Sequence, residues 1–124
     1  MFQNLDVFRL SAHKAQYAAH RQSVIARNIA NADTPNYKAQ DTPEFQPNLQ
    51  TAVVAPHRSH AKHLVVSGAM RTAVITRDTA YQEPNGNTVA LETEVLFADQ
   101  ARRDHNRALS VYRSSMEILR RVVG

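Results

Sequence analysis

Proline and glycine are confined to part of the chain, and this distribution restricts the fold more than any other feature of the sequence. All five prolines lie within 35–84, and segments 1–34 and 87–123 contain neither proline nor glycine. Inside a helix, proline costs about 3 kcal/mol and glycine about 1 kcal/mol, so long helices can form at both ends but not in the centre. We expect one elongated, mainly α-helical subunit with an N-terminal helix over 1–33, an irregular central segment over 34–86 and a C-terminal helix over 87–124.

Apolar residues recur with alternating steps of three and four at both ends, a spacing typical of helices that pair along a narrow stripe. Small side chains dominate the N-terminal stripe, which allows a neighbouring helix to approach closely. We therefore expect the two terminal helices to pair as a coiled-coil-like hairpin. The residues expected to pack in it and in assembly, termed the predicted seam, are Leu5, Phe8, Ala12, Ala15, Ala19, Ala26, Ile29, Leu109, Tyr112, Met116, Leu119 and Val123.

Capping signals indicate where the helices begin and end. Asn4 is a candidate N-cap for the first helix, and Asn87 or Thr88 for the second, after a turn at 84–87. The first helix should stop near Asp33, because the residue before a proline is pushed out of the helical region.

Charges follow the dipole of the C-terminal helix, with Glu92 and Glu94 near its start and Arg120 and Arg121 at its end. The two glutamates are two positions apart and point in different directions on a helix. We interpret them as helix-start charges and not as a general acid/base pair.

The central segment contains two short β-like pieces, 64–66 and 73–75, separated by Ser67-Gly68-Ala69. Such pieces are compatible with a small β-hairpin, although two strands alone are marginally stable.

Several classes of function are disfavoured by composition. The chain has no cysteine, which excludes thiolate zinc sites and thiol nucleophiles, and only three glycines, which leaves no phosphate-binding loop. His57, His60 and His63 recur every third residue, but no carboxylate or thiolate completes a ligand set, so we interpret them as loop histidines and expect no metal. No catalytic signature is present. We expect neither an enzyme nor a cofactor.

Membrane insertion and classical secretion are also disfavoured. The longest uninterrupted apolar run is four residues, too short for a transmembrane helix. Asp6 and Arg9 interrupt the apolar residues at the start, so we expect no cleaved signal peptide.

The arginines of the C-terminal helix leave a second class of function open. A small basic helical module could use them to bind nucleic acid or a regulatory partner. Asp99, Asp104 and Glu117 are interleaved with these arginines, and a solvated or interface-lining charged face explains the pattern as well. Nucleic acid is therefore not the partner we expect.

The most specific stretch of the sequence is residues 26–38, ARNIANADTPNYK. It resembles the N-terminal signature of bacterial flagellar rod and hook proteins, in which a helix ends in Asn-x-x-Asn-x-x-Thr-Pro-Gly-Tyr. Asn36 stands where that family most often has glycine, and asparagine tolerates the left-handed conformation better than most residues. The asparagines can bond exposed helix carbonyls before the proline redirects the chain. The matching motif residues are Asn28, Asn31, Asp33, Thr34, Pro35 and Tyr37.

The short length, the residues after the motif and the segment 86–92 resemble, within this family, a subunit of the proximal rod. The resemblance implies a structural protein of the flagellar basal body, built through its terminal helices into the axial drive shaft that crosses the periplasm. It implies export through the flagellum's own type III apparatus. It also implies contacts with other rod subunits, with further copies of the chain and with the export-gate and adaptor end of the rod.

Overall fold

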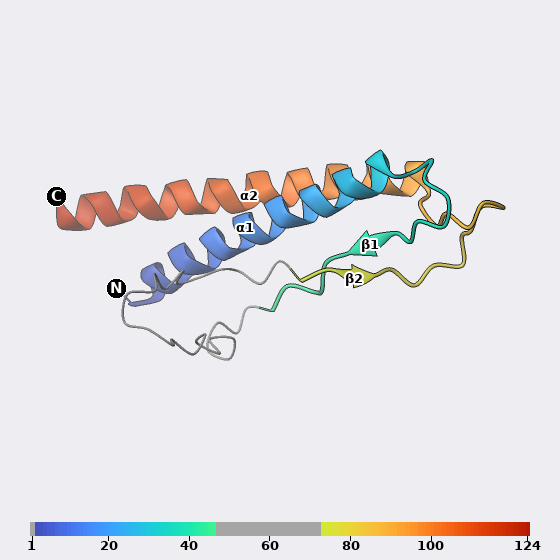
Figure 1. The fold of residues 1–124 in the computed structure, drawn as a ribbon. Helices are drawn as coiled ribbons and strands as arrows, with labels where there is room; N and C mark the ends of the chain where they lie inside the picture. Colours follow the sequence, from blue (N-terminus) through green and yellow to red (C-terminus); the bar gives the residue numbers. More distant parts are fainter. Residues whose placement is uncertain (1, 47–72) are drawn as a thin grey trace, which may run out of the picture.

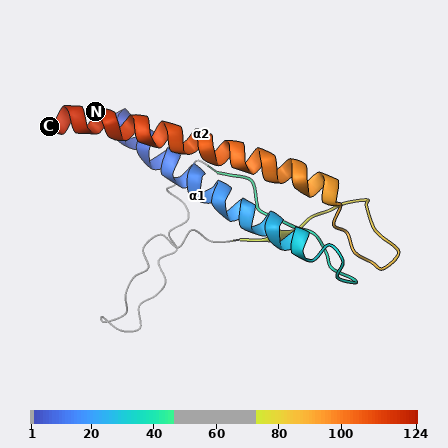
Figure 2. The same ribbon diagram turned by 90° about the horizontal axis from the view of Figure 1, so that it is seen from above.

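Two long helices account for most of the described residues, as the proline distribution predicts. The computed structural model describes residues 2–46 and 73–124. In it, α1 spans Phe2–Ala30 and α2 spans Leu91–Val123. The helices lie side by side with both chain termini at one end of the molecule (Figure 1; Figure 2). The coiled-coil-like hairpin expected from the sequence is confirmed.

The predicted helix caps are wrong. α1 begins at Phe2, so Asn4 lies inside the helix, and α1 ends at Ala30, before the expected stop near Asp33. α2 begins later than predicted: its N-cap is Ala90, with φ −100° and ψ 108° and no side-chain capping bond. The side chains of Asn87 and Thr88 instead accept hydrogen bonds from Val89 N and Ala39 N. The chain consequently stays extended up to Ala90.

The central segment contributes a two-stranded antiparallel sheet. β1 (Gln40–Asp41) pairs with β2 (Ile75–Thr76), with Gln40 opposite Thr76 and Asp41 opposite Ile75. Both strands run along α1 on the side away from α2 in Figure 1. A small β element is thus present, and the second predicted piece overlaps β2. The strand that pairs with β2 is β1, which comes soon after the turn that follows α1. The other predicted piece, 64–66, lies outside the described residues.

Buried side chains repeat every seven residues along both helices, which defines the actual line of contact. On α1 they include Ser11, Ala18 and Ile25, with Ala15 between the first two. On α2 they are Glu94, Ala101, Ala108 and Ser115. A strict seven-residue repeat keeps one stripe facing the partner helix along its length. Most of these side chains are small, and the Phe8 and Tyr112 rings stack nearby with centroids 4.6 Å apart.

The predicted seam lies beside this line of contact. Several of its residues come one position after a buried residue in the chain. Ala15 is buried, and Leu5, Ala19, Ala26, Ile29 and Val123 are exposed. The half-buried members are Phe8, Ala12, Leu109, Tyr112, Met116 and Leu119. The periodicity of apolar residues predicted a stripe of more hydrophobic side chains next to the real one. The residues that actually lie at the helix contact are mostly small and include serine. The role of the predicted seam in assembly stays a prediction.

Enlarging a small side chain at the helix contact should destabilise the hairpin. Ala101 is 0% exposed, so Ala101→Leu forces the helices apart and should lower the free energy of unfolding by about 2 kcal/mol. Urea unfolding followed by circular dichroism measures the change. The matched control, Gln100→Leu, alters an exposed position on the same turn and should stay within about 0.5 kcal/mol of the parent. Equal effects of the two substitutions would contradict close packing at Ala101.

Candidate functional site

The turn that follows α1 is built by the side chains of the sequence motif. Asn31 Nδ2 donates to the carbonyl of Arg27 at 2.8 Å, and Thr34 Oγ1 donates to Asn31 Oδ1 at 3.2 Å. The amide of Tyr37 then donates to Thr34 O at 3.3 Å. Asn31 therefore gives a carbonyl at the helix end a second donor beside its own backbone amide, which lies 3.1 Å from Arg27 O, and this bond to a helix carbonyl is the one that the motif predicts.

Asn36 and Gly86 bring two turns into direct contact. Asn36 has φ 61°, the left-handed conformation expected for the residue that replaces the family's glycine, and its amide donates to Asn85 O at 3.0 Å. Gly86 has φ +85°, and a Cβ atom there would lie 2.4 Å from Asn36 Oδ1. Glycine is therefore required at position 86 both for its backbone conformation and for the close approach of Asn36.

Asn87 connects the end of α1 to the segment leading into α2. Its side chain is 0% exposed, and Nδ2 donates to Asn31 O and to Thr34 O, both at 2.8 Å. Its Oδ1 accepts from Val89 N at 2.7 Å. The sequence predicted a capping role for Asn87. It did not indicate these bonds to the α1 turn, because the two carbonyl groups lie more than fifty positions earlier in the chain.

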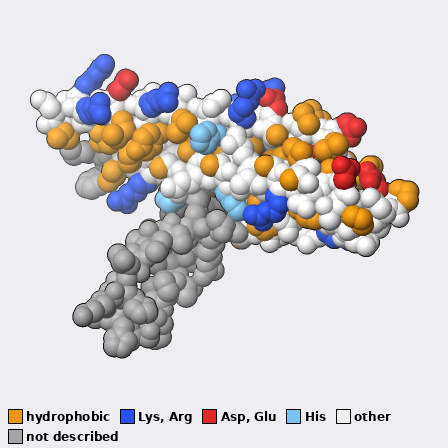
Figure 3. Space-filling model, turned by 45° about the horizontal axis from the view of Figure 1, so that its top comes forward, with side chains coloured by type: hydrophobic (Ala, Val, Ile, Leu, Met, Phe, Trp, Pro, Cys, Tyr) orange, Lys and Arg blue, Asp and Glu red, His pale blue; other side chains and the backbone are white. Residues whose placement is uncertain are grey.

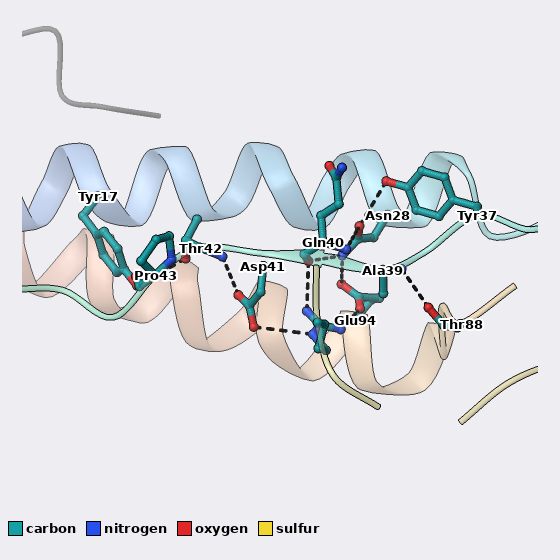
Figure 4. A network of polar contacts seen from close by, with 11 residues as sticks. Tyr17, Asn28, Tyr37, Ala39, Gln40, Asp41, Thr42, Pro43, Thr88 and Glu94 are labelled. Atoms are coloured by element: carbon teal, nitrogen blue, oxygen red, sulfur yellow. Dashed lines mark hydrogen bonds and ion pairs between the residues drawn. The ribbon is translucent and has the colours of Figure 1, made fainter. Parts of the chain in front are cut away.

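Asn28 lies at the centre of a second set of polar contacts (Figure 4). It is 0% exposed, and its Oδ1 accepts from Gln40 N at 2.9 Å and from the Tyr37 hydroxyl at 3.2 Å. Its Nδ2 donates to Gln40 O at 2.8 Å and to Glu94 Oε2 at 3.1 Å. The amide thus uses its full hydrogen-bonding capacity, and it binds β1 and α2 to α1. Of the two motif asparagines, Asn31 makes the expected side-chain bond to a helix carbonyl, and Asn28 does not.

Glu94 and Arg77 form the charged part of the same set. Glu94 is 0% exposed, and its Oε1 accepts a hydrogen bond from Arg77 Nη1. Arg77 Nε lies 3.4 Å from Asp41 Oδ2, and its guanidinium carbon lies 4.7 Å from the centroid of the Phe97 ring. We call Asn28, Tyr37, Gln40, Arg77 and Glu94 the Asn28 cluster.

Glu94 lies in the first turn of α2, as the interpretation of a helix-start charge predicts, but it also has a buried role that this interpretation does not include. It and Glu92 do point in different directions, as predicted, since Glu92 is exposed. Position 94, however, falls on the buried seven-residue repeat with Ala101 and Ala108. A carboxylate buried on that repeat needs a cation close to it. A glutamate in register with the alanines of the repeat was therefore a signal in the sequence that a partner cation would be present. Nothing in the sequence singled out Arg77, which comes from the irregular segment.

Backbone bonds around Tyr37 complete the junction. Thr88 N donates to Tyr37 O at 3.0 Å, and Ala39 N donates to Thr88 Oγ1 at 2.8 Å. Burial raises the pKa of the Tyr37 phenol, whose hydroxyl donates to Asn28 Oδ1. The Tyr37 ring packs against a small core of Ala32, Ala39 and Val89.

The motif residues thus divide into two groups. Asn28, Asn31, Thr34 and Tyr37 come together in the junction, whereas Asp33 and Pro35 are exposed. The polar groups of the junction bond one another, an arrangement that holds segments in place and leaves no evident nucleophile. Within residues 2–46 and 73–124, no three acidic or histidine side chains gather as a metal site. His57, His60 and His63 lie outside the described residues.

Replacing Asn28 should weaken the junction more than any exposed asparagine. Asn28→Ala removes the side-chain acceptor of Gln40 N and one donor each from Gln40 O and the buried Glu94 carboxylate, so we expect a loss of about 3 kcal/mol in unfolding free energy. Asn106→Ala, at an exposed position of α2, serves as the control and should change stability by less than about 0.5 kcal/mol. A loss at Asn28 no larger than the control's would show that the cluster adds no stability.

The contact between Asn36 and Gly86 predicts non-additive mutations. Gly86→Ala alone should cost about 2 kcal/mol, because the new Cβ meets Asn36 Oδ1 and the backbone has positive φ. Asn36→Gly alone should be nearly neutral, since glycine accepts φ 61°. In the double variant the steric part disappears, so its loss should be smaller than that of Gly86→Ala. Strict additivity in chemical denaturation would rule out the contact.

Comparisons with known proteins agree with the motif. A family model described as "Flagella basal body rod protein" matches residues 10–38, most of α1 and the turn after it. The chain is 30% identical over 119 residues to the flagellar basal body rod protein FlgB of Agrobacterium fabrum, covering 90% of this chain and 88% of that one. It is 34% identical over 117 residues to FlgB of Escherichia coli, covering 82% of each chain, and 26% identical over 122 residues to FlgB of Aquifex aeolicus, covering 96% of each. The resemblance noted in the sequence is confirmed: the chain belongs to the FlgB family of flagellar basal body rod proteins.

Proposed function

We propose that this chain is a structural, non-enzymatic subunit of the proximal part of the flagellar rod. In this proposal its terminal helices pack against other rod subunits and further copies of the chain, forming the axial drive shaft that crosses the periplasm. The subunit travels through the flagellum's own type III apparatus. Its place near the base of the rod brings it against the export-gate and adaptor end. The observation that carries the proposal is the amount of apolar surface that a single subunit leaves exposed on both helices.

Large apolar side chains face solvent along both helices of the isolated subunit. On α2, Leu96 is 71% exposed and Val95 is 59% exposed, and further exposed residues continue to the last turn. On α1, Leu5, Val7 and Ile29 are each more than one-third exposed. Figure 3 shows hydrophobic side chains in a continuous band between the helices near the termini, bordered by Lys and Arg. Exposed apolar patches of this kind mark surfaces that partner proteins cover.

The exposed members of the predicted seam fit the same role. Ala19, Ala26 and Ile29 lie on α1 beside the buried line, where a neighbouring helix would cover them. The Asn28 cluster and the Asn87 bonds, in turn, fix the end of the hairpin away from the termini. A subunit held at one end and apolar along its helices is suited to packing side by side with others.

The charges of α2 give the nucleic-acid alternative little support. Arg102 and Arg103 bond the Asp99 carboxylate at 3.0 and 2.5 Å. The hydrogen bond from Arg102 is the main cause that lowers the pKa of Asp99. These two arginines are thus partly neutralised within the helix.

Over the part of the chain that the structure describes, no helix has the length and apolar character needed to cross a membrane.

A deletion strain provides the test of this proposal. Without the gene, cells of the native host should be non-motile and lack rods, and an epitope-tagged copy should restore motility and appear in purified basal bodies. Leu119→Asp, at a half-buried position near the end of α2, should be expressed and exported but excluded from rods, because a charge would enter an apolar contact. Ser114→Asp, at an exposed position of the same helix, is the matched control and should assemble. Normal rods in the deletion strain would refute the proposal.

A further inference from the structure

Asn85-Gly86 is the single Asn-Gly pair in the chain. Asparagine followed by glycine is the dipeptide most prone to spontaneous deamidation, because glycine places no side chain in the way of ring closure. We propose that Asn85 is the deamidation site of this protein, and that the folded junction between the two turns suppresses the reaction. The proposal concerns the chemistry of the turn and does not depend on the proposed function.

The reaction needs two groups that the fold holds elsewhere. The Gly86 amide nitrogen must lose its proton and attack Asn85 Cγ, forming a five-membered succinimide as ammonia leaves. Water then opens the ring at either carbonyl to give aspartate or isoaspartate. The net change is hydrolysis of one side-chain amide to a carboxylate and ammonia, with water as the sole co-reactant.

In the structure, the attacking nitrogen is already committed. Gly86 N donates its proton to Glu83 O at 2.9 Å, which holds that proton and turns the nitrogen away from a free approach. Asn85 Oδ1 accepts from Asn87 N at 3.0 Å, which fixes the side-chain amide toward the following residue. Ring closure requires the Gly86 bond to break, because that nitrogen must lose its proton before it attacks.

Contacts on either side of the pair prevent the local opening that would free these groups. Asn85 O accepts from Asn36 N at 3.0 Å, and Gly86 O accepts from Lys38 Nζ at 3.2 Å. Gly86 is buried against Asn36, and Asn87 is fixed by two carbonyls of the α1 turn. The exposed side chain of Asn85 is therefore reachable by water but cannot cyclise while the junction is closed.

The two products should differ in their effect on the fold. Aspartate at position 85 keeps an oxygen for the Asn87 amide and leaves the backbone unchanged. Isoaspartate inserts an extra methylene into the main chain, which displaces either the Asn85 carbonyl from Asn36 N or Gly86 from Asn36. A chain that stays unfolded for long would thus lose the ability to close the junction.

The test compares deamidation in the folded chain and in urea. The purified full-length protein is incubated at pH 8.5 and 37 °C with and without urea, as conditions chosen for the reaction. Peptide mapping by mass spectrometry and enzymatic methylation of isoaspartate report the site and product. Modification at Asn85 should be at least about tenfold slower in the folded chain, because it proceeds only from the open fraction. Equal rates in the two states, or earlier modification of another asparagine in urea, would overturn the proposal.

Two further measurements separate the chemistry from a general effect of unfolding. Asn85→Gln should abolish the early modification in urea, and persistence of the signal in that variant would place the site elsewhere. Asn85→Asp should refold to the parent circular dichroism spectrum, whereas aged chains that carry isoaspartate should not. Complete refolding of the isoaspartate fraction would refute the proposed effect on the junction.

Discussion

The carboxylate of Glu94, buried between the helices, is the constraint on which the rest of the junction depends. A carboxylate removed from water is tolerated only when it is paired and hydrogen-bonded. Its two partners come from different segments: Asn28 Nδ2 from α1, 66 positions away, and Arg77 from the strand segment, 17 positions away. Satisfying this one charge therefore brings α1, α2 and the end of β2 to the same point. Arg77 extends the arrangement to Asp41 and Phe97.

The contact between α1 and α2 pairs the two helices along their length, whereas the polar junction holds them at one end only. Alanine and serine at the seven-residue repeat, such as Ser11, Ala18, Ala108 and Ser115, allow two helices to lie close together but bury little apolar area each. Such a stripe specifies register weakly, because neighbouring alanines are nearly equivalent. A buried polar pair at one position is a recognised means of fixing register, and Asn28 with Glu94 can serve that purpose here.

Apolar surface that the hairpin leaves uncovered connects this architecture to the proposed role in the rod. Leu96 and Val95 stay mostly uncovered in the single subunit, and their burial by neighbouring subunits would stabilise the helices by mass action. The junction, by contrast, satisfies its own polar groups, with Gln40 Oε1 the one buried side-chain atom without a partner among the described residues. One end of the subunit is thus internally complete, and the helices carry the surfaces available for assembly.

Local rules or a contiguous motif suffice to predict the two helices, the break after α1, the left-handed residue at Asn36 and the family. Proline and glycine disfavour a helix where they occur. Asparagine is one of the few residues that adopt the left-handed conformation after a helix end. Contacts within the folded chain settle which of two adjacent stripes is buried, that Asn87 binds the α1 turn and does not cap α2, and that Arg77 neutralises Glu94. These outcomes depend on pairs far apart in the chain. Their energies are set by burial and geometry, which local patterns of hydrophobicity do not encode.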